Sequence, residues 1–120
     1  MKYNKDAPIT LVEFENFTRF VAKHLSTDED DALKSFLAIN PEHGVIIQGT
    51  GGVRKLRWAA KGKGKSGGVR IIYYYHDAHM PLLLLTGFAK NEMSDLNAAD
   101  RNSMKKLLPL LVSQYKGHKT

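Results

Sequence analysis

Four basic residues occur within or beside segments that have the pattern of β-strands. Two of them are separated by one residue in the first segment, the third lies in the second, and the fourth follows the last. If these segments pair into a sheet, the four side chains can share one edge, where mutual repulsion makes them a poor stability device. We interpret the cluster as a candidate phosphate site, although a lone lysine at a strand end is more often only solvated. Its members are Lys55, Arg57, Arg70 and Lys90.

Cations fixed around a phosphate are sufficient, in principle, to cleave RNA. The ribose 2′-OH attacks the adjacent phosphate once it is deprotonated, and fixed cations stabilise the negative charge that develops in the transition state. A lysine among other cations has a lowered pKa and can exchange a proton, while a guanidinium presents a planar fork to phosphate oxygens. The same cluster suits a protein that binds RNA without cutting it, so both functions stay open at this point.

The positive charge of the chain is concentrated in one segment. The net charge is +6, yet no acidic residue occurs between His43 and His76, and the rest of the chain carries 11 basic and 12 acidic residues. This block favours a polyanionic partner such as nucleic acid over a merely solvated basic face. Its glycines argue against a membrane-binding helix. Besides the cluster, the block contains four candidates for RNA or ribosome binding, namely Arg54, Lys61, Lys63 and Lys65.

Several motifs in the chain resemble cofactor or metal sites but lack the required context. Residues 62–67 match G-x-G-x-x-G, but a strand follows them where a dinucleotide-binding helix would have to begin. His76 and His79 lie in a predicted turn with Asp77 as their one acidic neighbour, which fits ordinary turn residues better than metal ligands. The chain has no cysteine. We therefore expect no metal and no cofactor.

Length and composition predict one domain over residues 1–120. The chain has 42% hydrophobic and 25% charged residues, which is ordinary for a globular protein. Its longest apolar run, near residues 81–85, is far shorter than the roughly 18 residues that a membrane span needs. The polar N-terminus does not resemble a signal peptide. We expect a cytoplasmic protein with no membrane partner.

The N-terminal third has the pattern of a short strand and two helices. Residues 9–12 are β-prone and can form an edge strand. Apolar residues at helical spacing follow from Phe14 to Leu25. A second helix is predicted from about Thr27 to Asn40, because a hydroxyl at Ser26-Thr27 can cap it, acidic residues at 28–31 occupy its first turn, and Pro41 ends it.

The remainder predicts a sheet and a final helix. Three antiparallel strands are expected over residues 54–60, 69–75 and 81–88, with Trp58 and two of the tyrosines in the core and the loop over 61–68 mobile. Arg57 and Arg70 are expected on the exposed sheet face. A helix follows Asn97, its cap, with an apolar stripe that includes Leu107, and Pro109 is expected to interrupt it.

Four ordered blocks carry a resemblance to a known family. They are IQGTGGVRKLR at 47–57, KGKGK at 61–65, RIIYY at 70–74 and KNEMSDL at 90–96. Together they resemble toxins of the RelE/ParE superfamily, nearest to the HigB-type branch of type II toxin–antitoxin systems. The specific match covers about residues 46–97, and the flanking helices agree in outline.

The resemblance implies an α+β, RelE-like fold, with an antiparallel sheet of three to four strands, two N-terminal helices and a C-terminal helix. It implies a ribosome-dependent mRNA endoribonuclease that cuts mRNA in the ribosomal A site, contacts rRNA and is neutralised by a cognate antitoxin. The family's catalytic residues are basic; they correspond to Lys55, Arg57, Arg70 and Lys90. Neither Tyr115 nor the histidines match the family's further catalytic groups, which leaves Lys90 as the candidate general acid.

Two other functions remain open on the sequence. ParE-like members of the superfamily inhibit DNA gyrase without cutting RNA, and the cationic cluster disfavours this function because gyrase binding needs no phosphate site. A toxin-like protein that binds ribosomes or RNA without cleaving is the second alternative.

Overall fold

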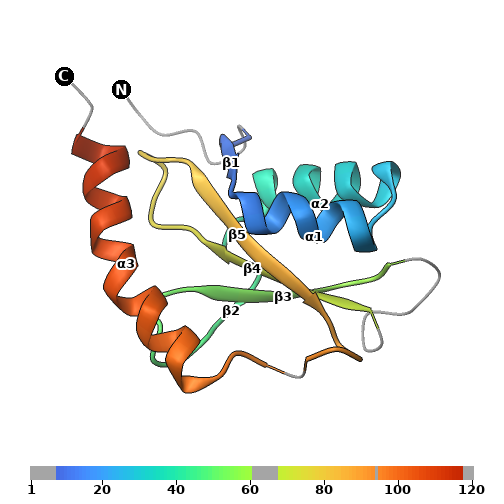
Figure 1. The fold of residues 1–120 in the computed structure, drawn as a ribbon. Helices are drawn as coiled ribbons and strands as arrows, with labels where there is room; N and C mark the ends of the chain where they lie inside the picture. Colours follow the sequence, from blue (N-terminus) through green and yellow to red (C-terminus); the bar gives the residue numbers. More distant parts are fainter. Residues whose placement is uncertain (1–7, 61–67, 94, 118–120) are drawn as a thin grey trace.

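The computed structural model describes residues 8–60, 68–93 and 95–117, and they form three helices and a five-stranded mixed sheet with the strand order β1-β5-β4-β3-β2 (Figure 1). The α+β class is therefore confirmed. The strands are β1 (Leu11–Glu13), β2 (Val45–Ile46), β3 (Arg54–Trp58), β4 (Val69–Tyr74) and β5 (Leu82–Ala89), and the helices are α1 (Glu15–His24), α2 (Thr27–Ile39) and α3 (Ala98–Gly117).

The antiparallel meander β3-β4-β5 is confirmed, but the sheet is larger than predicted and not purely antiparallel. β1 pairs in parallel with β5, and β2 pairs antiparallel with the first two residues of β3. Sequence pattern did not reveal β2 because it has two residues, Val45 and Ile46, both exposed.

The helical hairpin α1–α2 covers one face of the sheet (Figure 1). α2 begins and ends where predicted, and its N-terminus has a capping box in which Ser26 and Glu29 satisfy each other's backbone amides. Phe17, Leu33 and Leu37 are fully buried against the sheet. α1 approaches β5 so closely that a Cβ on Gly87 would lie 2.6 Å from the ring of Phe20, so this position requires glycine.

α3 lies along the other face, where Leu108 and Leu111 pack on Ile72, Tyr74 and Leu83 (Figure 1). The cap is confirmed, since the Asn97 side chain accepts from the amide of Asp100. The predicted interruption at Pro109 is wrong: the helix continues through it. Pro109 is exposed, so water can bond the carbonyl that loses its helical partner.

The predicted core is largely confirmed. Tyr73 and Tyr74 are buried, and Trp58 is half-buried against the helical hairpin. Leu107 departs from the prediction because its side chain is 42% exposed. The predicted mobility of the loop over 61–68 falls, except for Gly68, outside the described residues.

A tight loop before β3 sets the start of that strand. Gly49, Gly51 and Gly52 have positive φ angles, which suit glycine. Inside the loop the hydroxyl of Thr50, fully buried, donates to the carbonyl of Ile47 and accepts from the amide of Val53. This closed hydrogen-bond pattern fixes where β3 begins.

Candidate active site

Arg57 and Arg70 form a direct cross-strand pair. They are opposite each other in the antiparallel register of β3 and β4, which places their Cα atoms about 4.5–5.5 Å apart. Both project to the face that carries α3, because their neighbours Leu56 and Ile71 belong to the core under α1 and α2. Two guanidinium groups on directly opposed residues are unfavourable without an anion.

The two arginines differ in burial. Arg57 is exposed, whereas Arg70 is only 6% exposed, so the prediction that both are solvent-facing is wrong for Arg70. Arg70 lies in a central strand between Arg57 and Phe88, and its Nη1 donates to the carbonyl of Val69 at 3.2 Å. Burial, together with the charge of Arg57, lowers the pKa of Arg70 from its ordinary value.

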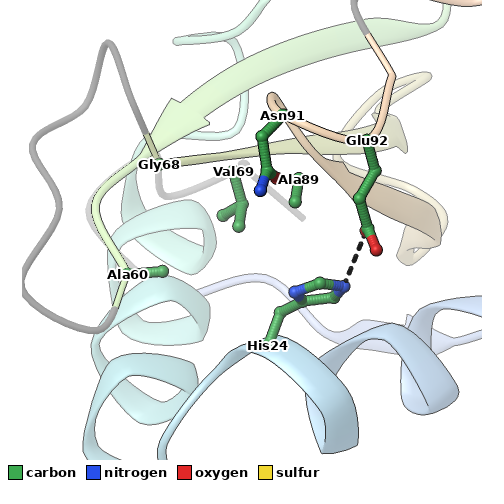
Figure 2. A pocket seen from close by; sticks show the side chains of 7 residues that line it. All are labelled: His24, Ala60, Gly68, Val69, Ala89, Asn91 and Glu92. Carbon is green, nitrogen blue, oxygen red and sulfur yellow. Dashed lines mark ion pairs between the residues drawn. The ribbon is translucent and has the colours of Figure 1, made fainter.

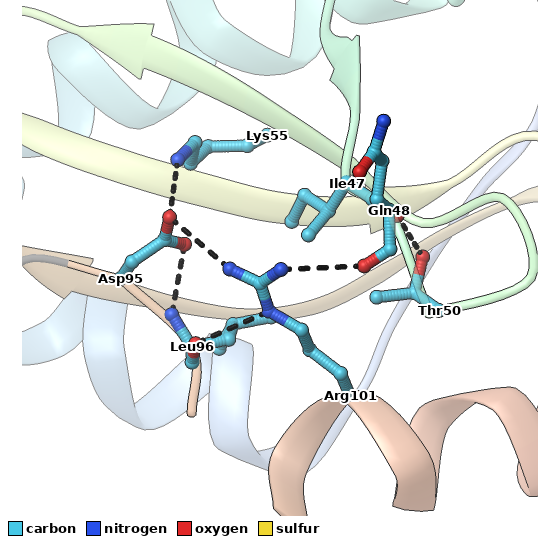
Figure 3. A network of polar contacts seen from close by, with 7 residues as sticks. All are labelled: Ile47, Gln48, Thr50, Lys55, Asp95, Leu96 and Arg101. Atoms are coloured by element: carbon cyan, nitrogen blue, oxygen red, sulfur yellow. Dashed lines mark hydrogen bonds and ion pairs between the residues drawn. The ribbon is translucent and has the colours of Figure 1, made fainter. Parts of the chain in front are cut away.

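Lys55 lies on the same face, two residues before Arg57, and it is held by an acidic residue. Its Nζ lies 3.1 Å from Oδ2 of Asp95, the same oxygen that Arg101 approaches at 3.4 Å (Figure 3). These contacts and the amide of Leu96 lower the pKa of Asp95, although partial burial opposes the shift. Lys55 is therefore a paired, positioned cation rather than part of an uncompensated cluster.

The same network connects the start of α3 to the loop before β3. Arg101 donates from Nε to the carbonyl of Leu96 at 3.2 Å and from Nη1 to the carbonyl of Gln48 at 3.4 Å (Figure 3). The loop that fixes the beginning of β3 is thus tied to the acid that orients Lys55. Sequence inspection missed Asp95 and Arg101, because no local spacing signals a contact between residues 40 positions apart.

Lys90 follows β5 directly and lies at the end of the sheet where Arg57 and Arg70 are paired. Its backbone amide donates to the carbonyl of Gly68, and its side chain is exposed. The turn that carries it is attached to α1, because the Glu92 carboxylate lies 3.1 Å from Nε2 of His24 (Figure 2). The same carboxylate lies 3.3 Å from Nζ of Lys23. The structure therefore brings three of the four predicted residues onto one face and places Lys90 at its end.

A small cavity of about 130 Å³ lies beside this turn (Figure 2). His24 and Glu92 line it together with apolar groups, including Val69 and Ala89. Its other walls belong to the core under α1, so it opens on the side of the sheet opposite Arg57. We assign the His24–Glu92 pair to fixing the turn rather than to the phosphate site.

A family comparison bears on this arrangement. Residues 12–116 match the profile of a family described as the RelE toxin of the RelE / RelB toxin-antitoxin system. The chain belongs to the RelE toxin family. The match includes β3, β4 and β5 and reaches into all three helices. The cationic face, which consists of Lys55, Arg57 and Arg70 on the α3 side of the sheet, therefore lies within the region that matches the family.

Of the remaining predicted residues of this RelE-family toxin, the structure describes Arg54, which does not join the face that carries Lys55, Arg57 and Arg70. Arg54 projects to the opposite face, where its Nη1 donates to the carbonyls of Glu42 and Gly44 at 2.9 and 2.8 Å. It thereby fixes the turn that precedes β2. Three further candidates lie outside the described residues, namely Lys61, Lys63 and Lys65.

The polar groups at the opposite end of the sheet have internal partners. The hydroxyl of Tyr74 and Nδ1 of His76 are 2.9 Å apart, and Asp77 pairs with Lys116 at 2.7 Å. Within residues 8–60, 68–93 and 95–117, no group of three His, Cys, Asp or Glu residues is arranged to hold a metal ion. Nor does any helix in those ranges combine the length and apolarity that a bilayer crossing requires.

Proposed function

We propose that this RelE-family toxin is a ribosome-dependent mRNA endoribonuclease that inhibits translation by cutting mRNA in the ribosomal A site. The observation that carries the proposal is the Arg57–Arg70 cross-strand pair, with Lys55 two residues away on the same face. Paired arginines in a sheet cost stability unless an anion separates them, and the phosphate of an RNA backbone is such an anion.

In the proposed reaction the arginines act on the phosphate. Arg57, exposed, donates to the non-bridging oxygens as the RNA strand arrives, and Arg70 meets the same phosphate from its buried position. When the 2′-OH attacks, negative charge grows on these oxygens in a partly desolvated place, where fixed guanidinium groups stabilise the transition state more than the ground state. The bond from the 2′-oxygen to phosphorus forms, the bond from phosphorus to the 5′-oxygen breaks, and the proton of the 2′-OH passes to water. The products are a 2′,3′-cyclic phosphate and a 5′-hydroxyl.

The two lysines have separate roles in the proposal. Lys55 is oriented by Asp95 and supplies a third positive charge beside the phosphate. Lys90 stands at the end of the sheet and protonates the departing 5′-oxygen, as the candidate general acid. The proposal requires no metal ion or other cofactor, and it takes a cognate antitoxin as the partner that neutralises the toxin in the cytoplasm.

The proposal is tested by Arg57→Ala. Loss of one preorganised donor to developing charge costs about 10²- to 10³-fold in rate, so mRNA cleavage in a translating extract should fall by that factor. The thermal midpoint should stay near that of the wild type, because Arg57 is exposed and a solvent-facing charge contributes little to stability. Arg57→Lys should also be impaired, since an ammonium lacks the bidentate fork.

Arg19→Ala is the matched control. Arg19 is an exposed arginine on α1, on the other side of the sheet, where it pairs with Glu15. This variant should cleave at the wild-type rate. If Arg57→Ala cleaves normally while it melts normally, the cationic face is not the active site. If the wild type leaves mRNA intact and broken DNA accumulates instead, the toxin acts on gyrase.

A further inference from the structure

A groove of about 470 Å³ lies between the C-terminal end of α2 and the outer edge of β3. In the described parts of the chain, β2 pairs only with Arg54 and Lys55, so no other described strand flanks the rest of β3 on that side. The lining side chains come from α2, from the segment before β2, from β2 itself and from β3. They are Phe36, His43, Val45, Lys55, Leu56, Arg57 and Trp58.

Aromatic rings form one wall of this groove. The ring centroids of Phe36 and Trp58 are 5.5 Å apart with an interplanar angle of 46°, and His43 meets Phe36 edge-on at 5.0 Å. His43 is exposed, and Phe36 and Trp58 are only partly buried although their inner sides pack on the core. Flat rings that remain accessible at the rim of a core suit stacking with another ring.

Charge distinguishes this groove from an ordinary apolar docking surface. Its described lining includes two cations, Lys55 and Arg57, and no acidic residue. Arg57 belongs both to the groove and to the pair with Arg70, so the groove is continuous with the candidate phosphate site. A ligand that is aromatic at one end and anionic at the other matches this arrangement, and a nucleotide has that chemistry.

We propose that the groove binds one unpaired nucleobase of the RNA strand whose phosphate lies between Arg57 and Arg70. The base stacks on the aromatic wall near Trp58 and His43, and the backbone leaves the groove past Arg57. The inference rests on the proposed function for the identity of the strand, and it adds where a neighbouring base is held. Such binding is tolerant of sequence, because every base presents a π-face.

Trp58 is the single tryptophan of the chain, so its fluorescence reports on this groove alone. The probe is a short single-stranded 2′-O-methyl oligoribonucleotide, which cannot be cleaved because its attacking hydroxyl is blocked. The control ligand has the same backbone without bases. We expect the base-containing strand to quench Trp58, and the abasic strand to bind through its phosphates with little effect on the fluorescence.

Two substitutions remove the aromatic wall in different ways. His43→Ala removes an exposed ring, and Trp58→Leu removes the indole but keeps an apolar group against the core. Because Trp58→Leu lacks the fluorophore, the affinity of each variant for the strands is measured by fluorescence anisotropy of labelled strands. Each should weaken the base-containing strand by about five-fold or more and leave the abasic strand unchanged. His79→Ala is the matched control, since His79 is an exposed histidine in the turn between β4 and β5.

The outcomes separate this inference from the proposed function. Absence of binding by the base-containing strand, equal affinities for the two strands, or binding that leaves Trp58 fluorescence unchanged would overturn the groove as a base site, even if mRNA is cleaved on ribosomes. Base-dependent quenching without any cleavage of mRNA would retain the groove and contradict the proposed function. If Trp58 fluorescence changes only when a protein partner is added, the groove is a protein-docking surface and the inference is wrong.

Discussion

The two faces of the sheet differ in the side chains that they carry. Under α1 and α2 the sheet contributes Leu56, Ile71, Tyr73 and Leu84 to an almost wholly apolar core. On the other face, Ile72 and Leu83 pack against α3 over one part of the strands, and the other part carries arginines and a lysine. The same two strands therefore supply tight packing to one side and concentrated positive charge to the other.

Under the proposed function, the contacts that stabilise the fold and the residues that act on RNA lie on opposite sides of the sheet. The hydrophobic contacts of the helical hairpin hold β3 and β4 in register, and the register holds Arg57 opposite Arg70. Repulsion between Arg57 and Arg70 and the desolvation of Arg70 oppose folding, and the contacts of the apolar face offset these costs. Like charges that destabilise the free protein are expected at a site that binds an anion.

The largest expected effect is on the apolar face. Phe17 is fully buried between α1 and the sheet, so Phe17→Ala should lower the free energy of unfolding by about 3–5 kcal/mol. Chemical denaturation measures this loss. Leu110→Ala is the control, because Leu110 is 67% exposed on α3, and it should change stability by less than about 0.5 kcal/mol. Equal losses for the two would mean that the hairpin does not hold the sheet.

The sequence predicted this apolar face well, and for a physical reason. Helical spacing in residues 14–25 and the Ser26 cap are local signals, and alternation along 54–60 specifies which side of a strand is buried. Lys55, Arg57 and Arg70 also lie on one face, as the alternation of the two strands predicted. What alternation cannot give is depth: it placed Arg70 on the correct face but not in a buried, central position.

The second prediction concerns the buried cation. Arg70→Met replaces a desolvated guanidinium, next to the like charge of Arg57, with an apolar chain of similar length. We expect mRNA cleavage to fall by about 100-fold, by analogy with the loss of one oxyanion donor. The thermal midpoint should stay near that of the wild type, because the substitution also removes the desolvation cost of the guanidinium and its repulsion with Arg57.

Arg70→Lys sharpens the same comparison. It retains a positive charge and loses the fork, so its cleavage rate should lie between those of the wild type and Arg70→Met. Thermal melts and cleavage assays on the two variants are read together. A marked drop in the melting temperature of Arg70→Met would assign Arg70 to structure and would break the separation of the two faces.

Long-range polar contacts are the part that the sequence could not provide. In the sequence, Asp95 stands out only as part of the KNEMSDL block at 90–96. Its partners Lys55 and Arg101 belong to β3 and α3. Whether a carboxylate meets a lysine across the fold depends on how α3 enters over the sheet. The pairing therefore depends on tertiary structure. Because Asp95 compensates Lys55, the face carries less net positive charge than its basic residues alone suggest.

The smallest expected effect is that of Asp95→Asn. The contacts with Lys55, Arg101 and the amide of Leu96 lower the pKa of the Asp95 carboxyl below its ordinary value of 3.8. A lowered pKa in the folded state stabilises the protein above the unfolded pKa, and this contribution disappears as the pH falls through the folded pKa. The Asp95 side chain is 38% exposed, so the free energy of unfolding of the wild type should exceed that of the variant by less than about 1 kcal/mol.

Urea unfolding of both proteins, from neutral pH to below pH 3.8, measures that difference directly. It should be constant at the upper end and shrink towards zero in acid, since a protonated Asp95 resembles asparagine in charge. Asp31→Asn removes an exposed carboxylate on α2 and corrects for the general effect of net charge. A difference that does not change with pH would show that the amide fails for reasons of shape. In that case the carboxylate charge does not hold Lys55, and the lysine must be counted again as an uncompensated cation of the α3 face.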